Sequence, residues 1–259
     1  MDNSGGVLDS DESISIAYLP DPVALELDPD YPSPAVRQRL LHESSMQFRQ
    51  ITCVELLDGI LERGKFNILC VPGGFAPHLD ARLGVLGADI IRRFVSGGGG
   101  YVGICAGAFF GIMLELLPLE ARDIDHCGSP SGPCRLLFSP IGQCVLGAES
   151  DEVTVRYHNG PLFRPLNSAV YSLATFRTDF RGRSFPMMDS PAAVCGMHGL
   201  GLVVLISPHI EDGACERSHA PFRNIFRFCH TCSQASLHSQ HSLDAQPTNC
   251  LQLLAEHCV

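Results

Sequence analysis

The stretch Tyr101-Val102-Gly103-Ile104-Cys105-Ala106-Gly107-Ala108-Phe109-Phe110 predicts a short apolar strand that turns abruptly into a helix. Gly103 and Gly107 lie two residues on either side of Cys105, in the G-x-C-x-G pattern of a nucleophile elbow. Such a turn strains the backbone and crowds the flanking positions, so glycine suits them. It also places the Cys105 sulfur at a helix N-terminus, where unpaired N–H groups and the helix dipole favour a thiolate. The alternative is an inert, buried cysteine at a glycine-rich strand end.

A second stretch, which runs from Gly199 to Glu211, supplies partners for that cysteine. It reads as an apolar strand that ends in Ser-Pro-His-Ile-Glu. Residues two apart in an extended segment point the same way, so we expect the Glu211 carboxylate beside the His209 imidazole. Taken alone, His209 is better explained as a solvated loop histidine. Together with the cysteine turn, the pattern predicts a Cys105–His209–Glu211 arrangement for nucleophilic catalysis.

Strand and helix patterns alternate along most of the chain. The nearly continuous apolar run from Phe66 to Val71 is typical of a strand buried on both faces of a parallel sheet. The alternation predicts a doubly wound α/β fold with a mostly parallel sheet flanked by helices. Strands are expected at 13–19, 48–54, 66–71, 151–157, 168–178 and 192–197, and helices at 33–46, 56–61, 83–95 and 221–229. A loop is expected at 21–31, and loops with short strands at the edge of the domain are expected at 115–152.

The same patterns predict the domain organisation. We expect a disordered acidic lead at residues 1–12 and one α/β domain over 13–230. Residues 231–259 are rich in Ser, His and Gln, which predicts a flexible C-terminal tail.

At these motifs the sequence resembles a known superfamily. Gly-Ile-Cys-Ala-Gly followed later by Ser-Pro-His-Ile-Glu is similar to the class I glutamine amidotransferase-like proteins, which have a flavodoxin-like fold. The neighbouring motifs Val71-Pro72-Gly73-Gly74 and Tyr157-His158-Asn159-Gly160-Pro161 resemble one branch, the amidotransferase-like domain at the N-terminus of fungal biotin–protein ligases, also found as a stand-alone protein. The resemblance covers about residues 14–228 and names a fold and a site rather than a substrate.

Backbone groups near the cysteine are candidates for substrate binding. Glycines after a parallel strand, here Gly73 and Gly74, let backbone N–H groups approach a ligand. The resemblance implies an oxyanion hole formed by the N–H groups of Gly74 and Ala106; the alternative is an ordinary tight turn. Loops on a rigid scaffold often carry binding groups, so Tyr157, His158 and Asn159 are further candidates for ligand contacts. A plain Asn-Gly turn is an equal alternative for that segment.

Composition excludes several classes of partner and compartment. The formal net charge is −10 and the isoelectric point about 5.5, without a basic stripe. This argues against nucleic acid and anionic membranes as partners. The N-terminus does not resemble a signal peptide, and the apolar runs are shorter than the ~20 residues of a membrane-spanning helix. Of twelve cysteines, Cys53, Cys70 and Cys195 lie in apolar strands and are expected to be reduced, which predicts a cytoplasmic location.

Two Cys/His groups raise the question of a metal. His126, Cys127 and Cys134 lack a paired C-x-x-C spacing, whereas Cys229-His230-Thr231-Cys232 has one, with Cys215 and His219 upstream. A structural zinc site needs four converging ligands. A core-facing Cys229 explains the second spacing equally well, so we predict no metal and no cofactor, and the roles of Cys215, Cys229 and Cys232 stay open.

These residues predict acyl transfer through a thioester on Cys105, with a small-molecule amide as substrate. The resemblance implies glutamine as the amide, and a synthetase or ligase as the partner that uses the ammonia. Two alternatives remain open. One is a non-catalytic or regulatory ligand-binding domain linked to biotin–protein ligase, so whether the protein is an enzyme stays undecided. The other is a DJ-1-like glyoxalase or deglycase, which is disfavoured because the first strand carries Ser13, Ser15 and Tyr18 but no Glu.

Overall fold

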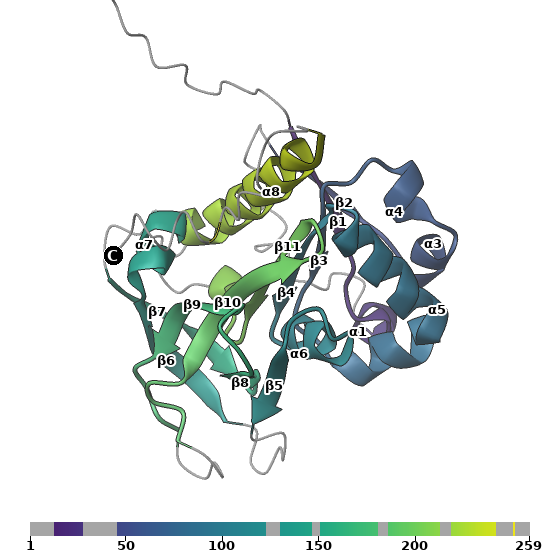
Figure 1. The fold of residues 1–259 in the computed structure, drawn as a ribbon. Helices are drawn as coiled ribbons and strands as arrows, with labels where there is room; N and C mark the ends of the chain where they lie inside the picture. Colours follow the sequence, from purple (N-terminus) through teal and green to yellow (C-terminus); the bar gives the residue numbers. More distant parts are fainter. Residues whose placement is uncertain are drawn as a thin grey trace, which may run out of the picture.

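The computed structural model of this protein (Figure 1) describes residues 13–27, 46–122, 130–146, 151–180, 186–212, 219–241 and 251. The expected acidic lead at 1–12 and the expected helix at 33–46 lie outside these residues, except for Met46. Its strands are β1 (Ile14–Tyr18), β2 (Met46–Gln50), β3 (Ile68–Val71), β4 (Gly100–Ile104), β5 (Leu119–Arg122), β6 (Ser131–Phe138), β7 (Glu152–His158), β8 (Leu162–Pro165), β9 (Tyr171–Phe176), β10 (Pro191–His198) and β11 (Gly201–Ile206). Its helices are α1 (Pro22–Leu27), α3 (Cys53–Leu57), α4 (Ile60–Arg63), α5 (Ala76–Ser96), α6 (Ala106–Met113), α7 (Pro140–Leu146), the 3-10 helix η1 (Ile210–Asp212) and α8 (His219–His241).

The main sheet has two halves of different strand direction. Among the described residues its order is β2-β1-β3-β4-β11-β10-β9-β6-β7. The strands β2, β1, β3, β4 and β11 run parallel to one another. From β11 onward each neighbour is antiparallel, through β10, β9, β6 and β7. The predicted α/β fold is therefore confirmed, with an antiparallel extension on one side of the parallel part.

Two hydrophobic layers cover the sheet, one on each face. Alternate side chains of β3 show the division: Ile68 and Cys70 belong to one layer, and Leu69 and Val71 to the other. The first layer includes Phe222, Ile225 and Phe226 of α8, and the second includes buried residues of α5 and α6. In Figure 1, α8 and α7 lie on one side of the sheet and α3, α4 and α5 on the other. All four β3 side chains are buried, as expected for a strand covered on both faces.

The segment after β1 differs from the sequence prediction. A loop was expected over 21–31, but Pro22–Leu27 forms α1. Asp21 is the reason, because its Oδ1 accepts hydrogen bonds from the N–H groups of Val23 (2.9 Å) and Ala24 (3.3 Å). An Asp cap with proline at the first helical position is a standard way to begin a helix.

The prediction of a strand over 48–54 was too long. β2 ends at Gln50, and Thr52 begins α3 with a capping box in which its side chain and that of Glu55 bond each other's backbone N–H groups. The helix expected at 83–95 is also longer. α5 begins at Ala76 and is interrupted at Gly84, where φ is 55° and ψ is −162°.

The least regular part of the sequence folds into more structure than expected. β6 is an eight-residue strand between β9 and β7, and α7 follows it where loops and short strands were predicted. Ser139 begins this helix, since its hydroxyl accepts a hydrogen bond from the N–H of Gly142 at 3.0 Å.

The boundary of the predicted tail was also wrong. A flexible tail was expected from residue 231, but α8 continues to His241. Cys232 and Ser233 are buried, and the Ser233 hydroxyl accepts a hydrogen bond from the N–H of Leu202 at 3.0 Å. Residues 231–241 are therefore helical despite their polar composition, and Leu251 is also buried in the core. In the described part of the chain, no helix is both long and apolar enough to cross a membrane.

Candidate active site

Four strand ends meet at one edge of the sheet. β1, β3, β4 and β11 are mutually parallel neighbours, so their carboxyl ends lie at the same edge. Asp21, Gly73, Cys105 and His209 each follow one of these strands within a few residues. Ligands of open α/β sheets bind at this edge. The topology therefore gathers residues that are up to 188 positions apart in the sequence.

Cys105 occupies a sharp strand-to-helix turn. Its φ is 52° and its ψ is −104°, in the left-handed half of the map that non-glycine residues rarely enter. Its N–H donates to the Ile206 carbonyl of β11 at 2.8 Å, and its carbonyl accepts from the N–H groups of Ala108 (3.0 Å) and Phe109 (3.1 Å). The side chain is 6% exposed. These bonds hold the strained residue at the start of α6.

The two glycines around Cys105 are there because nothing larger fits. A Cβ atom on Gly103 would lie 2.4 Å from the Gly107 carbonyl oxygen. A Cβ atom on Gly107 would lie 1.9 Å from the carbonyl oxygen of Val71, the last residue of β3. Both contacts are far below van der Waals distance and involve backbone atoms. The crowding expected from the G-x-C-x-G pattern is present in the structure.

His209 and Glu211 lie side by side after β11. The His209 Nδ1 is 2.8 Å from the Glu211 Oε1, as the His-x-Glu spacing predicted. The backbone N–H of His209 donates to the Arg156 carbonyl of β7 at 2.7 Å, which pins the segment to the antiparallel half of the sheet. The imidazole also hydrogen-bonds the side chain of Cys105. Cys105, His209 and Glu211 thus form one continuous chain of contacts.

This chain of contacts favours a protonated His209. Burial lowers the pKa of the imidazole, but hydrogen bonds to Cys105 and Glu211 and their negative charges outweigh burial and raise the pKa to about 10. His158, nearby, shows the opposite shift: burial, with the positive charges of His209 and Arg156, lowers its pKa. The site therefore stabilises an imidazolium at His209 rather than at His158.

The three candidates at the end of β7 have different surroundings. The His158 carbonyl lies 3.4 Å from the Cys105 sulfur, so this residue reaches the site through its backbone. Asn159 has a φ of 52°, and its N–H donates to the Pro130 carbonyl at 3.1 Å. Tyr157 is fully buried; its hydroxyl donates to the Gly160 carbonyl at 2.7 Å and its ring stacks on Phe180. The side chain of Tyr157 therefore packs in the core, while the chain beside it lies at the cysteine.

The glycine turn after β3 lies directly under the histidine. A Cβ atom on Gly73 would be 2.5 Å from the His209 Cε1, so the ring packs on the Gly73 backbone. Gly74 has a φ of 144°, which favours glycine. The Pro72 carbonyl accepts a hydrogen bond from the N–H of Gly107 at 3.1 Å. Ala106 is buried as the first residue of α6. The turn and the cysteine helix are thus joined through their backbones.

Sequence reasoning missed two polar residues at this edge, Asp21 and His78. Asp21 is 4% exposed, and its carboxylate lies 3.0 Å from the Nδ1 of His78 on α5. A signal was present in the sequence: Asp followed by Pro is a helix start, which places the aspartate at the end of the first strand.

The Cys/His groups weighed as metal ligands are only partly described. His126, Cys127 and Cys215 lie outside the described residues, and no group of three or more His, Cys, Asp or Glu that could hold a metal occurs within them. Cys229 is buried against Gly100, and its thiol donates to the Leu202 carbonyl at 3.3 Å. Core packing therefore explains the position of Cys229 without a metal. Cys53, Cys70 and Cys195 are buried free thiols, as predicted.

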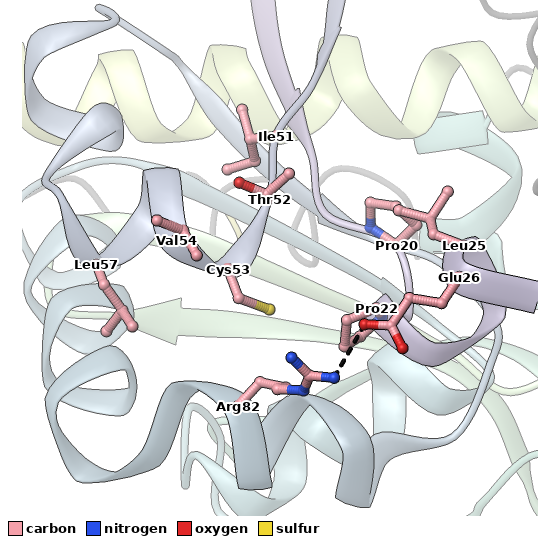
Figure 2. A pocket seen from close by; sticks show the side chains of 10 residues that line it. All are labelled: Pro20, Pro22, Leu25, Glu26, Ile51, Thr52, Cys53, Val54, Leu57 and Arg82. Atoms are coloured by element: carbon pink, nitrogen blue, oxygen red, sulfur yellow. Dashed lines mark hydrogen bonds and ion pairs between the residues drawn. The ribbon is translucent and has the colours of Figure 1, made fainter. Parts of the chain in front are cut away.

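A pocket of about 420 Å³ lies elsewhere on the molecule, between α1, α3 and α5 (Figure 2). Its walls are largely apolar, and an ion pair between Arg82 and Glu26 (2.9 Å) crosses it in Figure 2. The Cys53 thiol points into this region, and burial, only partly offset by the charge of Arg82, raises its pKa. Cys105 and His209 do not line this pocket. It is lined by Pro20, Pro22, Leu25, Glu26, Ile51, Thr52, Cys53, Val54, Leu57 and Arg82.

Several solved structures have a similar fold. PurLQS from Thermotoga maritima has a TM-score of 0.59 at 16% identity, over 84% of this chain and 99% of that chain. The glutaminase domain of CTPS from Trypanosoma brucei, solved with bound acivicin, has a TM-score of 0.54 at 14% identity, over 85% of this chain and 94% of that one. The chain therefore shares its fold with these two proteins.

Sequence comparison is more specific but covers less of the chain. Residues 62–115, which include Gly73, Gly74 and Cys105, match the family described as "Biotin-protein ligase, N terminal". A Chlamydia muridarum protein described as uncharacterized is 33% identical over 160 residues. That match spans 56% of this chain and 60% of the relative. The predicted resemblance to this branch is supported over the cysteine motif.

Proposed function

We propose that this protein is a cysteine-dependent amidohydrolase of the glutamine amidotransferase type. The observation that carries the proposal is the chain of contacts from Cys105 through His209 to Glu211, with Cys105 on a strained turn at the start of a helix. A nucleophile, a base that reaches it and a carboxylate that orients the base are the parts that covalent acyl transfer needs. A glutaminase domain with the same fold makes glutamine the first amide to test.

The proposed reaction uses these groups in two steps. The Cys105 thiolate attacks the amide carbonyl, and the N–H groups of Gly74 and Ala106 stabilise the oxyanion. The His209 imidazolium gives its proton to the leaving nitrogen as the C–N bond breaks, which leaves a thioester and a neutral imidazole. Water then attacks the thioester, His209 takes its proton, and the thiolate departs unchanged. Glu211 keeps Nδ1 of His209 bonded throughout, so that the other ring nitrogen serves Cys105.

Ammonia released from glutamine would need an acceptor. We therefore propose a synthetase or ligase as the partner, and the match to the biotin–protein ligase N-terminal family favours a ligase. We also propose a cytoplasmic location, because the buried cysteines Cys53, Cys70 and Cys195 are free thiols, which reducing compartments maintain.

The test is the alkylation rate of Cys105 by iodoacetamide between about pH 6 and pH 9, measured by peptide-resolved mass spectrometry. An ordinary thiol below its titration range reacts about tenfold faster per pH unit. We expect a nearly flat rate for Cys105, and an ordinary, steeper profile in His209→Ala. The exposed Cys144 is the reference thiol within the same molecule. A wild-type Cys105 that follows Cys144 across the whole range would refute an activated nucleophile.

Substrate is then sought by ammonia release from glutamine, asparagine and simple amides, with Cys105→Ser as the control. Cys105 and Glu211 are only 6% and 9% exposed, which favours a second candidate, a regulatory domain whose site is closed. In that case the protein would change the rate of a biotin–protein ligase assay, and wild type and Cys105→Ser would act equally.

A further inference from the structure

The buried carboxylate of Asp21 contacts the glycine turn that follows β3. The Asp21 Oδ2 accepts a hydrogen bond from the N–H of Phe75 at 2.8 Å, and both carboxylate oxygens lie within 3.1 Å of the His78 Nδ1. Its Oδ1 also accepts from two N–H groups of α1. One side chain therefore joins α1, the turn after β3 and α5.

Capping of α1 does not account for this arrangement. The cap uses Oδ1, whereas Oδ2 is directed at Phe75, which lies 54 residues along the chain. Taking a carboxylate out of water is costly unless hydrogen bonds compensate for it. Asp21 meets this cost by contacts with three separate elements, and the contact with Phe75 is the one that leads to the cysteine site.

The turn itself is held at both of its ends. On one side, the Pro72 carbonyl accepts the N–H of Gly107, which belongs to the cysteine helix. On the other side, the N–H of Phe75 is bound by Asp21. Gly73 and Gly74 lie between these anchors, and a Cβ atom on Gly74 would be 2.6 Å from the Cβ of Asp21. The aspartate thus fixes the turn both by hydrogen bonding and by direct packing.

Such anchoring matters because donors to an oxyanion work only if they are oriented before the reaction. Two consecutive glycines are the most flexible backbone a chain can offer. We propose that Asp21 is a positioning residue that orients the Gly73–Gly74 turn toward the oxyanion formed at Cys105, and that His78 holds Asp21 in place. The inference rests on the proposed acyl-transfer function and adds a role for residues outside the cysteine, histidine and glutamate.

The test compares two reactions of the same sulfur. Acylation of Cys105 by p-nitrophenyl acetate passes through a tetrahedral oxyanion and releases p-nitrophenolate, whereas alkylation by iodoacetamide forms no oxyanion. In Asp21→Asn, the amide oxygen can still cap α1, but the NH₂ group then faces the N–H of Phe75. Loss of one oxyanion donor costs about 10²–10³-fold, so displacement of the turn should slow acylation by at least about tenfold. Alkylation should change by less than about twofold.

Thr52→Ala is the matched control, because it removes a helix cap at the same sheet edge without touching the turn. It should leave both rates unchanged. His78→Ala should slow acylation alone, by a smaller factor, and serves as the second variant if Asp21→Asn unfolds on thermal denaturation.

The outcomes separate the two proposals. If Cys105 is acylated equally fast in wild type, Asp21→Asn and His78→Ala, the positioning role is wrong while the proposed function stands. Equal acylation in wild type and His78→Ala also overturns the role if Asp21→Asn does not fold. If wild-type Cys105 is neither acylated nor alkylated faster than Cys144, the proposed function fails and the positioning role fails with it.

Discussion

Gly73→Ala is expected to uncouple His209 from Cys105 without unfolding the protein. The backbone of Gly73 is not among the positive-φ glycines, so alanine can adopt its conformation. The new Cβ would lie 2.5 Å from the His209 Cε1, against an ordinary contact of at least 3.4 Å. The ring must therefore move by about 0.9 Å. Because Glu211 holds the ring at Nδ1, the movement is taken up mainly at the bond to Cys105.

An ordinary thiol is only about 3% thiolate at pH 7, whereas a thiol paired with an imidazolium is largely thiolate, so loss of this pairing should lower the alkylation rate of Cys105 near pH 7 by up to about 30-fold. The assay is iodoacetamide labelling, with Cys144 as the internal reference and thermal unfolding as the check on folding. Gly97→Ala is the control for alanine substitution at a distance, because Gly97 follows α5 with a φ of −82° and an added Cβ would meet no atom closer than 3.1 Å. A folded Gly73→Ala protein whose Cys105 reacts at the wild-type rate would show that His209 does not activate the cysteine.

Three further predictions test the fold and the electrostatics. Gly107→Ala places a Cβ 1.9 Å from a backbone oxygen of β3, and overpacking of this kind should lower the free energy of unfolding by about 3 kcal/mol, measured with urea; a stable variant would contradict the crowding. Glu211→Gln removes one of the groups that raise the His209 pKa to about 10, so the ring should titrate at least about one unit lower by NMR. A raised histidine pKa stabilises the fold fully below about pH 6.5, and this stabilisation is lost as the pH rises through about 10. The difference in free energy of unfolding between wild type and Glu211→Gln should therefore shrink with rising pH. A difference that grows would contradict the pairing of a protonated His209 with Glu211. Deletion of residues 231–259 removes Ser233, which bonds β11, and should cost at least about 1 kcal/mol, whereas a truly flexible tail would cost nothing.

Local pattern was sufficient for the elements whose signals are short-range. The strand at β3, the turn at Cys105 and the pairing of His209 with Glu211 were predicted because apolar runs, glycine spacing and the two-residue period act within a few positions. The same reasoning failed where a side chain overrode composition. The cap by Asp21 makes a helix of a Pro-rich segment, and burial of Cys232 and Ser233 extends α8 into a polar stretch.

The contacts of Tyr157 and Asp21 could not be predicted from local sequence patterns. The Tyr157 side chain is buried in the core, although Tyr157 precedes the His-Asn-Gly turn. The Asp21 carboxylate accepts a hydrogen bond from the N–H of Phe75, which lies 54 residues later in the sequence. Which face of a strand lies toward a ligand depends on the strands beside it. Strand order depends on pairing across the whole sheet, which no short stretch of sequence specifies.

The amino-acid sequence by itself determined the class of fold, the strained cysteine turn and the candidate Cys–His–Glu group, because these depend on periodicity and on residues close in the chain. Only the tertiary structure decided that the ends of β1, β3, β4 and β11 meet at one edge. It also decided that Asp21 anchors the glycine turn, because parallel pairing brings together residues whose separation along the chain carries no local signal.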